Sequence, residues 1–342
     1  MFDCAKDVLS FHDEKVTLPQ SDRTAMRDRR NANRDRSRKG LEKNAGPPID
    51  EHVVQGSYAM KTMLRHDAND YDIDDGVYFA KEDLVGPRGA ELTSRQAREM
   101  VRDAVDDGSF ADAPEVHGNC VRVVYKKGYH VDMPVYRKVS DDGAVYYELA
   151  SASGWKRSDA RDVTEWFDDV RSASADGVQL RRIVRLIKKF AKSRDSWSGQ
   201  LLSGFGITAL VAQEFVHYTR EDEALYYTMK AIRDRLTWNL VVAHPVTPND
   251  TITDGPEDPK ARRLKGKLTE AIDNMAPLFA SDCTRNEALG CWDKVFFTTH
   301  FSERGEARDV SEKSVASTSA AIIGSQSDGG SGIFSAGGSR HA

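Results

Sequence analysis

The chain has 342 residues, of which 39% are hydrophobic and 30% charged, and its formal net charge is −5. This length favours two packed lobes over one domain, and the overall acidity argues against a protein that coats nucleic acid in bulk. No apolar run approaches the ~20 residues that cross a membrane, and no secretory signal is recognisable, so we expect no membrane partner. Scattered cysteines without CxxC spacing favour a reducing cytoplasm; they are Cys4, Cys120, Cys283 and Cys291.

A long basic helix is expected near the start of the chain, from Ser21, its expected N-cap, to Asn44. Its arginines could meet a nucleic-acid backbone, or they could form a solvated face paired with acidic residues of the same helix. We favour the second interpretation, with Asp28, Asp35 and Glu42 as the partners. The arginines concerned are Arg27, Arg29, Arg30, Arg34, Arg36 and Arg38.

A strand, a turn and a helix are expected next. Residues 51–55 read as a short strand that stops at Gly56, and Ser57 is expected to cap a helix that reaches about Leu64. Glycine lets the backbone approach a ligand closely. The serine hydroxyl and the exposed N–H groups of a helix start can hold phosphate oxygens. This turn is therefore a candidate phosphate site.

Two aspartates, Asp72 and Asp74, lie on an expected strand over residues 71–80. Alternate residues of a strand project from one face, so a third aspartate on a neighbouring strand would complete a site for two Mg²⁺ ions. Taken alone, the DIDD segment could equally be an acidic surface turn.

The candidate for the third aspartate is Asp132, on an expected strand over residues 129–137 that follows another over 120–126. Asp132 is flanked by apolar residues, and a buried carboxylate without a partner is costly. A bound cation would remove that cost. A salt bridge to an arginine such as Arg122 would remove it as well, and the two interpretations stay open.

The rest of the chain is mostly helical in pattern. A helix at 93–107 and a strand at 144–150 complete the mixed region, and further helices are expected at 159–170, 178–192, 205–215, 221–240, 259–279 and 286–301. The helix at 178–192 carries a basic face, and the serine-rich turn after it could bring a lysine and a serine toward one triphosphate. Beyond Glu303 the chain is rich in Gly and Ser and cannot bury enough apolar surface to order itself.

The combination of Gly-Ser, a short helix, Asp-Ile-Asp and His-Val-Asp-Met-Pro resembles a known family. It is similar to the bacterial cGAS/DncV-like nucleotidyltransferases, which make cyclic oligonucleotide signals in CBASS anti-phage defence. The resemblance also covers the segments QGSY, DIDDG, CVRV, HVDMPVY, TEWF and AHPVTPND. It implies an α+β fold, in which a polymerase β-like nucleotidyltransferase palm of mixed sheet and helices packs against a C-terminal helical lobe. The expected divisions are a nucleotidyltransferase core with the long N-terminal helix at 1–150, the helical lobe at 151–303 and a flexible tail at 304–342.

The same resemblance implies roles for individual residues. Asp72, Asp74 and Asp132 would be catalytic and would coordinate two Mg²⁺ ions, for which Mn²⁺ could substitute. The nucleotide contacts that it implies are Gln55, Gly56, Ser57, Lys189, Ser203, Arg122 and Asp250.

The expected activity is a cyclic dinucleotide or trinucleotide synthase that uses ATP, GTP or other nucleoside triphosphates and needs no nucleic acid. Its product would be a second messenger that activates a cyclic-nucleotide-responsive effector against phage. Alternatives are a linear oligoadenylate synthase, a nucleotidyltransferase acting on RNA, or a nucleotide-binding scaffold without turnover. In relatives of this type, a ubiquitin-like conjugation system joins the C-terminus to other proteins, so the tail that ends at Ala342 is a candidate for such attachment; an inert linker is the alternative.

Overall fold

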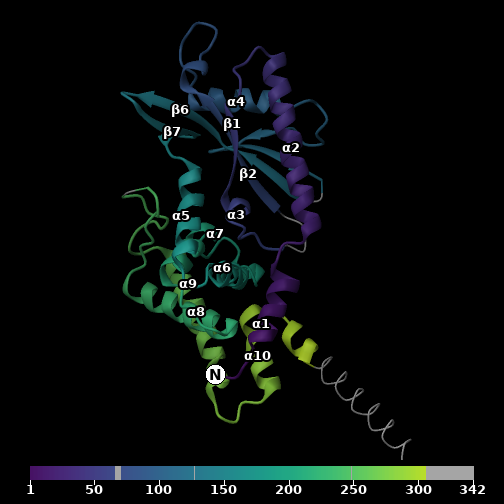
Figure 1. Ribbon diagram of the computed structural model, residues 1–342, viewed down its shortest axis with the longest axis vertical. Helices are drawn as coiled ribbons and strands as arrows, with labels where there is room; N and C mark the ends of the chain where they lie inside the picture. The colour runs from purple at the N-terminus through teal and green to yellow at the C-terminus, as the bar shows by residue number, and fades with distance from the viewer. Residues whose placement is uncertain (66–70, 127, 248, 306–342) are drawn as a thin grey trace, which may run out of the picture.

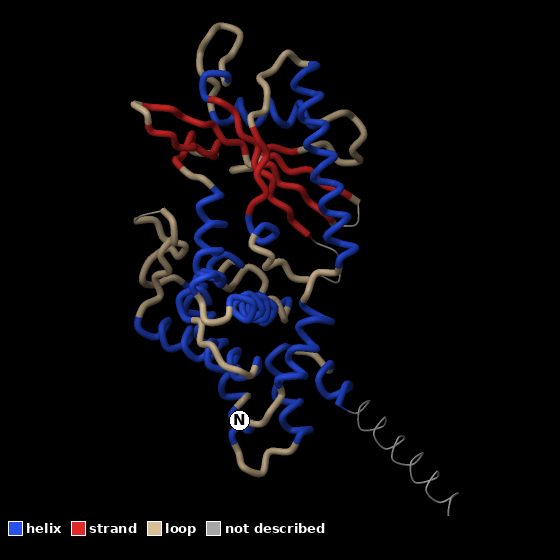
Figure 2. Tube along the Cα trace, in the orientation of Figure 1, coloured by secondary structure: helices blue, strands red, loops and turns tan. Residues whose placement is uncertain are grey.

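The protein is described here by a computed structural model that covers residues 1–65, 71–126, 128–247 and 249–305. Figure 1 shows a part built on a β-sheet, drawn uppermost, and a second part made of helices below it. Figure 2 shows that the strands are confined to the first part. The expected flexible tail lies, from residue 306 onward, outside the described residues.

The strands of the described residues form one mixed sheet of eight, in the order β3-β4-β5-β2-β6-β7-β8, with β1 paired to β2. β2 pairs in parallel with β5 and with β6, and the other pairs are antiparallel. The strands are β1 (Glu51–Gln55), β2 (Tyr71–Ala80), β3 (Glu115–Val116), β4 (Val121–Tyr125), β5 (Tyr129–Met133), β6 (Val135–Asp141), β7 (Ala144–Ser151) and β8 (Gly154–Arg157).

The strand expected over residues 129–137 is divided in two at Pro134. β5 pairs with β2 from Tyr129 opposite Tyr71, and β6 resumes the same register with Val135 opposite Val77. Proline has no N–H to give to the ladder, so the interruption falls there. The sequence pattern did not indicate the short strands β3 and β8.

Two helices, α2 (Gln20–Lys43) and α4 (Ser94–Val105), pack on each other and on the sheet. They share an apolar core with the inward-facing residues of the strands, among them Met26, Val101 and Ile73. Thr93 caps α4 and forms a reciprocal pair of hydrogen bonds with Gln96. This capping box fixes the point at which the helix begins. This packing leaves the opposite side of β2 toward the helical part.

The helical part has its own core, which includes Ile183, Leu210 and Trp292. No described helix is long and apolar enough to span a membrane. The helices of this part, with the short α3 that faces them, are α1 (Ala5–Phe11), α3 (Gly56–Ala59), α5 (Ala160–Ala173), α6 (Gly177–Ala191), α7 (Gly204–Glu214), α8 (Glu221–Trp238), α9 (Pro259–Asn274) and α10 (Arg285–Phe296).

The first residues of the chain pack in this second core and not on the sheet. Cys4, Val8, Phe11 and Val16 are buried among the helices of the C-terminal half, and the main-chain N–H of Cys4 donates to the Asp222 carboxylate at 2.8 Å. The expected division at residue 150 therefore differs from the packing at its N-terminal end, because α1 lies within the helical lobe.

Two helix starts differ from the prediction. α2 begins at Gln20 after Pro19, whose extended conformation precedes the helix, so Ser21 lies in the first turn and is not the cap. α3 ends at Ala59 instead of Leu64, and Ser57 is its second residue with Gln55 at the cap position. The short span leaves residues 60–65 as an irregular link between the sheet and the helical lobe.

Several arginines of α2 contact residues of other elements, while Arg27 and Arg38 pair with Asp28 and Asp35 of the same helix. Arg34 donates to the two oxygens of the buried Asp75 carboxylate through Nε and Nη2, and the Arg29 guanidinium stacks 4.0 Å from the ring centroid of Tyr129. Arg36 reaches Asp107 beyond the helix at 2.8 Å. Intrahelical pairing is thus only part of the outcome, because several of these side chains are used between elements.

Candidate active site

Three aspartates lie close together where β2 and β5 run side by side. Asp72 and Asp74 are on β2, and Asp132 is on β5, directly opposite Asp74 in the parallel register. Because Asp72 and Asp74 are alternate residues of one strand, their side chains leave the same face of the sheet. The structure thus places Asp132 on a neighbouring strand, as the sequence led us to expect.

Asp74 sits in a strongly acidic environment. Its side chain is half-buried, and burial, followed by the charges of Asp132 and Asp72, raises the pKa of its carboxyl group to about 7. Desolvation and like charges both disfavour the ionised form. A bound cation would relieve both effects at this point of the sheet.

The carboxylate of the third aspartate, Asp132, is bound by Arg122. Its guanidinium, on β4, donates to the two oxygens of Asp132 at 2.7 and 2.6 Å, and its Nη2 lies 3.6 Å from Asp72 Oδ2. Asp132 is only 8% exposed, and this fork of hydrogen bonds raises the pKa of Arg122. The salt bridge considered from the sequence is therefore present.

In this arrangement, no group of three or more His, Cys, Asp or Glu side chains among the described residues is positioned to hold a metal ion. The residue types nevertheless suit Mg²⁺, which prefers carboxylate oxygens, and the crowded negative charge at Asp74 favours a cation. Asp72 and Asp74 would hold it from β2, and Asp132 would join them once released by Arg122.

Gly56 makes room for Asp74. Its backbone has a positive φ of 64°, and a Cβ at this position would lie 2.3 Å from Asp74 Oδ2. Only glycine meets both conditions without strain. The expected contact of Gly56 with a ligand is thus joined by a second reason for glycine here, which is the approach of the turn to the aspartate strand.

Gln55 is turned into the sheet. It is 4% exposed, its Nε2 donates to Tyr78 Oη at 3.3 Å, and its Oε1 accepts from Tyr136 Oη at 3.2 Å. The side-chain amide is therefore used to hold the end of β1. Ser57, the second residue of α3, lines the cavity described next.

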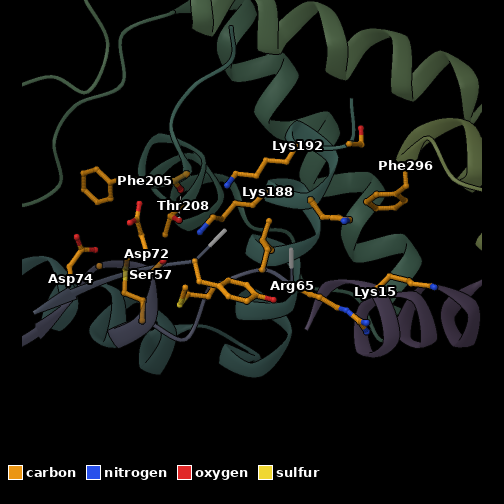
Figure 3. Close-up of a pocket in the computed structure, with 18 of the residues that line it drawn as sticks. Lys15, Ser57, Arg65, Asp72, Asp74, Lys188, Lys192, Phe205, Thr208 and Phe296 are labelled. Carbon is orange, nitrogen blue, oxygen red and sulfur yellow. Dashed lines mark hydrogen bonds between the residues drawn. The ribbon is translucent and has the colours of Figure 1, made fainter. Parts of the chain in front are cut away.

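A cavity of about 1010 Å³ lies between the sheet and the helical lobe, at the upper end of the ~300–1,000 Å³ typical of small-molecule sites. Figure 3 shows Asp72, Asp74 and Phe205 near one end, Lys188 and Lys192 toward the middle, and Lys15, Arg65 and Phe296 near the other end. The aspartate strand and the basic face of α6 thus border the same space.

Lys188 was not singled out from the sequence, although it borders this cavity together with the predicted Lys189. Lys188 is 6% exposed, and its Nζ donates to the Thr62 carbonyl oxygen at 3.0 Å. Burial, followed by the charges of Lys192 and Arg185, lowers its pKa to about 8. Its position four residues after the buried Val184 could have indicated that it borders the apolar stripe.

Three predicted nucleotide contacts lie outside the set of residues that line the cavity: Arg122, which is bound to Asp132, and Ser203 and Asp250. The Ser203 hydroxyl accepts from the main-chain N–H of Gly206 at 3.1 Å and so caps α7, while the next residues, Gly204 and Phe205, line the cavity. Asp250 pairs with Lys156 of β8 at 3.2 Å. The structure therefore brings Ser203 to the rim and holds Asp250 in a loop contact.

Residues 50–136 match the family described as "Cyclic GMP-AMP synthase DncV-like, nucleotidyltransferase domain". A curated protein from Escherichia albertii, named cyclic GMP-AMP synthase, is 26% identical over 212 residues, which are 60% of this chain and 46% of that protein. The chain thus matches under half the length of this relative.

Solved structures share the fold. Escherichia coli DncV bound to 3′-deoxy GTP superimposes with a TM-score of 0.62 at 18% identity, covering 82% of this chain and 92% of that one. The CD-NTase CdnG of Bradyrhizobium diazoefficiens, solved with GTP, gives a TM-score of 0.66 at 15% identity, covering 89% and 98%. The expected α+β fold, a polymerase β-like palm packed against a helical lobe, is confirmed.

Proposed function

We propose that this chain, a member of the DncV-like nucleotidyltransferase family through its residues 50–136, joins nucleoside triphosphates into a cyclic dinucleotide or trinucleotide. The observation that carries the proposal is one cavity lined by Asp72 and Asp74 of β2 and by lysines of α6, with Asp132 opposite Asp74 on the neighbouring strand β5. Carboxylates and lysines on opposite walls suit a triphosphate with its metal ions. The GTP-bound relatives support nucleotides as substrates.

The residues divide the work by their positions. Asp72, Asp74 and Asp132 would hold two Mg²⁺ ions, or Mn²⁺ in their place. Bound there, the ions would neutralise triphosphate charge and lower the pKa of the ribose hydroxyl that attacks. Gly56 and Ser57 line the same cavity, where the main-chain N–H groups of the turn and the serine hydroxyl would contact phosphate oxygens.

The helical lobe would bind the β- and γ-phosphates, which leave as pyrophosphate. Lys188 and Lys189 border the cavity on α6, and an ammonium group within reach of the β- and γ-phosphates stabilises the charge that builds on pyrophosphate. No protein nucleophile is required by this reaction, because the acceptor is a hydroxyl of a second nucleotide. A repeat of the step on the linear intermediate would close the ring.

The test is product formation from labelled nucleoside triphosphates and Mg²⁺, followed by phosphatase treatment. We expect a phosphatase-resistant product from the wild-type chain and none from Asp72→Asn with Asp74→Asn. An unchanged thermal midpoint in the variant would show that the fold is intact. Activity that survives both substitutions would refute the site.

The same assay separates the alternatives. A product that phosphatase degrades completely would indicate a linear oligonucleotide synthase, and tight nucleotide binding without turnover would indicate a scaffold. Mass spectrometry of the product from mixed nucleotides would identify the bases and the ring size.

We also propose a cellular role for the product and for the C-terminal tail. The product would activate a cyclic-nucleotide-responsive effector against phage, with the enzyme acting in the cytoplasm. The tail at 304–342, which lies outside the described residues from 306 onward, would be the attachment point of a ubiquitin-like conjugation system. A tail truncation that leaves cellular activity unchanged in the presence of the conjugating proteins would count against that part.

A further inference from the structure

A second, smaller cavity of about 130 Å³ lies beside the large one, and Met63 lines both. Leu18, Tyr58 and Met63 give it apolar walls, and Arg23 and Lys61 add two cationic groups. Its volume is well below the ~300–1,000 Å³ typical of small-molecule sites, and it has room for a few water molecules or one small ion. The charge of its lining favours an anion.

The small cavity lies where the chain crosses between the two parts of the molecule. Arg23 belongs to the start of α2, which follows the passage from α1 in the helical part to the sheet (Figure 1). Lys61 belongs to the irregular link over residues 60–65. A β-bridge between Thr17 and Leu64 pairs the two passages. An ion bound in the small cavity would therefore contact both of them.

The backbone of Lys61 is held in the left-handed region, with a φ of 57°. Lys61 follows Met60, the C-cap of α3, at the position where glycine is the usual residue and where an L side chain is strained. Within the described ranges, neither Lys61 nor Arg23 forms an ion pair with a carboxylate. The fold thus keeps a charged side chain where glycine would relieve the backbone.

Arg185 of α6 adds a further positive charge. Its Nε is buried, and no group in the described part of the chain accepts a hydrogen bond from it. Burial, followed by the charges of Arg181 and Arg23, lowers its pKa to about 10. Asp13 opposes this effect, but its side chain is 72% exposed and pairs with His12. A buried cation without a partner is costly, and a bound anion would offset that cost.

We propose that Arg23 and Lys61 bind one phosphate-type oxyanion, inorganic phosphate or pyrophosphate, in the small cavity, with the charge of Arg185 attracting the ion toward α6. Arginine offers a fork of donors and lysine a point charge, and both bind phosphate oxygens. The ion would tie the start of α2 to the link at 60–65 and so stabilise the join between the two parts. It needs neither the aspartates nor a divalent cation, so the inference is independent of the proposed function.

The experiment measures the thermal midpoint and the calorimetric binding of the full chain with phosphate and with pyrophosphate in EDTA, against sodium chloride at equal ionic strength. We expect at least one of the two ions to raise the wild-type midpoint above its value in chloride, and the tighter one identifies the ligand. Arg23→Gln and Lys61→Gly should each weaken binding about tenfold or more and abolish the shift. Because Lys61→Gly relieves its backbone, it keeps the test valid where Arg23→Gln does not fold.

Three variants are matched controls and should keep the shift. Arg27→Gln removes an exposed arginine one turn further along α2. Ala45→Gly makes the same backbone change as Lys61→Gly, at a φ of 51°, without the loss of a charge. Lys192→Met removes a lysine of the large cavity.

Two results would overturn the proposal. One is a midpoint shift no larger than that in chloride, or a shift that both Arg23→Gln and Lys61→Gly retain. The other is a shift that only Lys192→Met abolishes, because the ion would then lie in the large cavity.

The result is distinguishable from a failure of the proposed function. Asp72→Asn with Asp74→Asn should abolish product formation and leave phosphate binding in EDTA as in the wild type. A chain that makes no product but binds phosphate through Arg23 and Lys61 refutes the proposed function alone. A chain that makes product, while its phosphate shift survives both substitutions, refutes this inference alone.

Discussion

Arg122 and Asp132 face each other across neighbouring strands β4 and β5, and the guanidinium holds both carboxylate oxygens at 2.7 and 2.6 Å. The residue that the resemblance assigns to the nucleotide is thus bound to the residue that it assigns to the metal. An arginine fork and a divalent cation compete for the same oxygens. Arg122 and a bound cation would therefore compete for Asp132.

This competition predicts that Arg122→Gln increases the affinity of the nucleotide-free protein for Mn²⁺. A hydrogen bond to a charged group contributes about 1.5–3 kcal/mol, so releasing Asp132 should tighten Mn²⁺ binding by about tenfold or more. Electron paramagnetic resonance of free Mn²⁺ measures the affinity of the protein for this ion directly. Arg36→Gln, which breaks the pair with Asp107, is the control and should leave Mn²⁺ affinity as it is. Unchanged affinity in Arg122→Gln would contradict the prediction.

A second prediction concerns the contact between Gly56 and Asp74. Gly56→Ala imposes a left-handed conformation on alanine, which costs about 1–2 kcal/mol, and brings a Cβ within 2.3 Å of Asp74 Oδ2. We expect the free energy of unfolding to fall by more than that backbone cost, together with weaker Mn²⁺ binding.

Gly89→Ala is the matched control for that substitution. Gly89 has a similar positive φ of 74°, but an added Cβ meets nothing within 4 Å, so it carries the backbone cost alone. Urea unfolding of the two variants isolates the contact. Equal losses of stability in the two variants, with Mn²⁺ affinity intact in Gly56→Ala, would show that a Cβ at position 56 does not disturb Asp74.

The aspartate strand could be predicted because its chemistry is local. Alternation along residues 71–80 puts Asp72 and Asp74 on one face, and the apolar neighbours of Asp132 mark its strand as buried. These features depend on the strand period and on short motifs, which a sequence displays directly.

The other wall of the cavity depends on packing between lobes, which the sequence does not display. Lys188 and Lys189 are adjacent and chemically identical, and the hydrogen bond that Lys188 donates to the Thr62 carbonyl oxygen joins segments far apart in the sequence. Ser203 and Asp250 bear plausible side chains, yet helix capping and an ion pair with Lys156 use them. Phe205 gave no signal, because an aromatic residue in an apolar helix reads as core.

A pH dependence is expected from His12, which is 3% exposed. Burial, followed by the charge of Arg185, lowers the pKa of its imidazole to about 4, below the value near 6.5 of an unfolded chain. The neutral ring is therefore favoured in the fold, and its contribution is present above about pH 6.5 and lost as the pH falls toward 4. The loss is on the order of 3 kcal/mol by linkage.

The measurement compares urea unfolding at pH 7 and pH 4.5 for the wild type and His12→Gln. We expect the variant to lose less stability between the two values than the wild type does. His117→Gln alters an exposed histidine and should follow the wild type. A variant that loses as much stability as the wild type would rule out His12 as the source.

The last prediction uses the buried lysine to test which residue holds the triphosphate. Lys188 has a pKa of about 8 because its ammonium is buried, and only the charged form attracts phosphate. In the free protein at pH 9, Lys188 is neutral in most molecules. The protein must therefore take up a proton when it binds tripolyphosphate. Affinity for tripolyphosphate should therefore fall between pH 7 and pH 9, at most about tenfold per pH unit above 8.

Lys188→Met should weaken tripolyphosphate at pH 7 and should flatten this pH profile. Lys192→Met, which removes an exposed lysine of the same cavity, should weaken binding less and should keep a pH-dependent profile, shifted to higher pH because the charge of Lys192 helps to lower the pKa of Lys188. Calorimetry at pH 7, 8 and 9 in buffers of different ionisation enthalpy reports both the affinity and the proton uptake. A wild-type profile that stays flat, with no proton taken up at pH 9, would mean that Lys188 serves only as the link to Thr62.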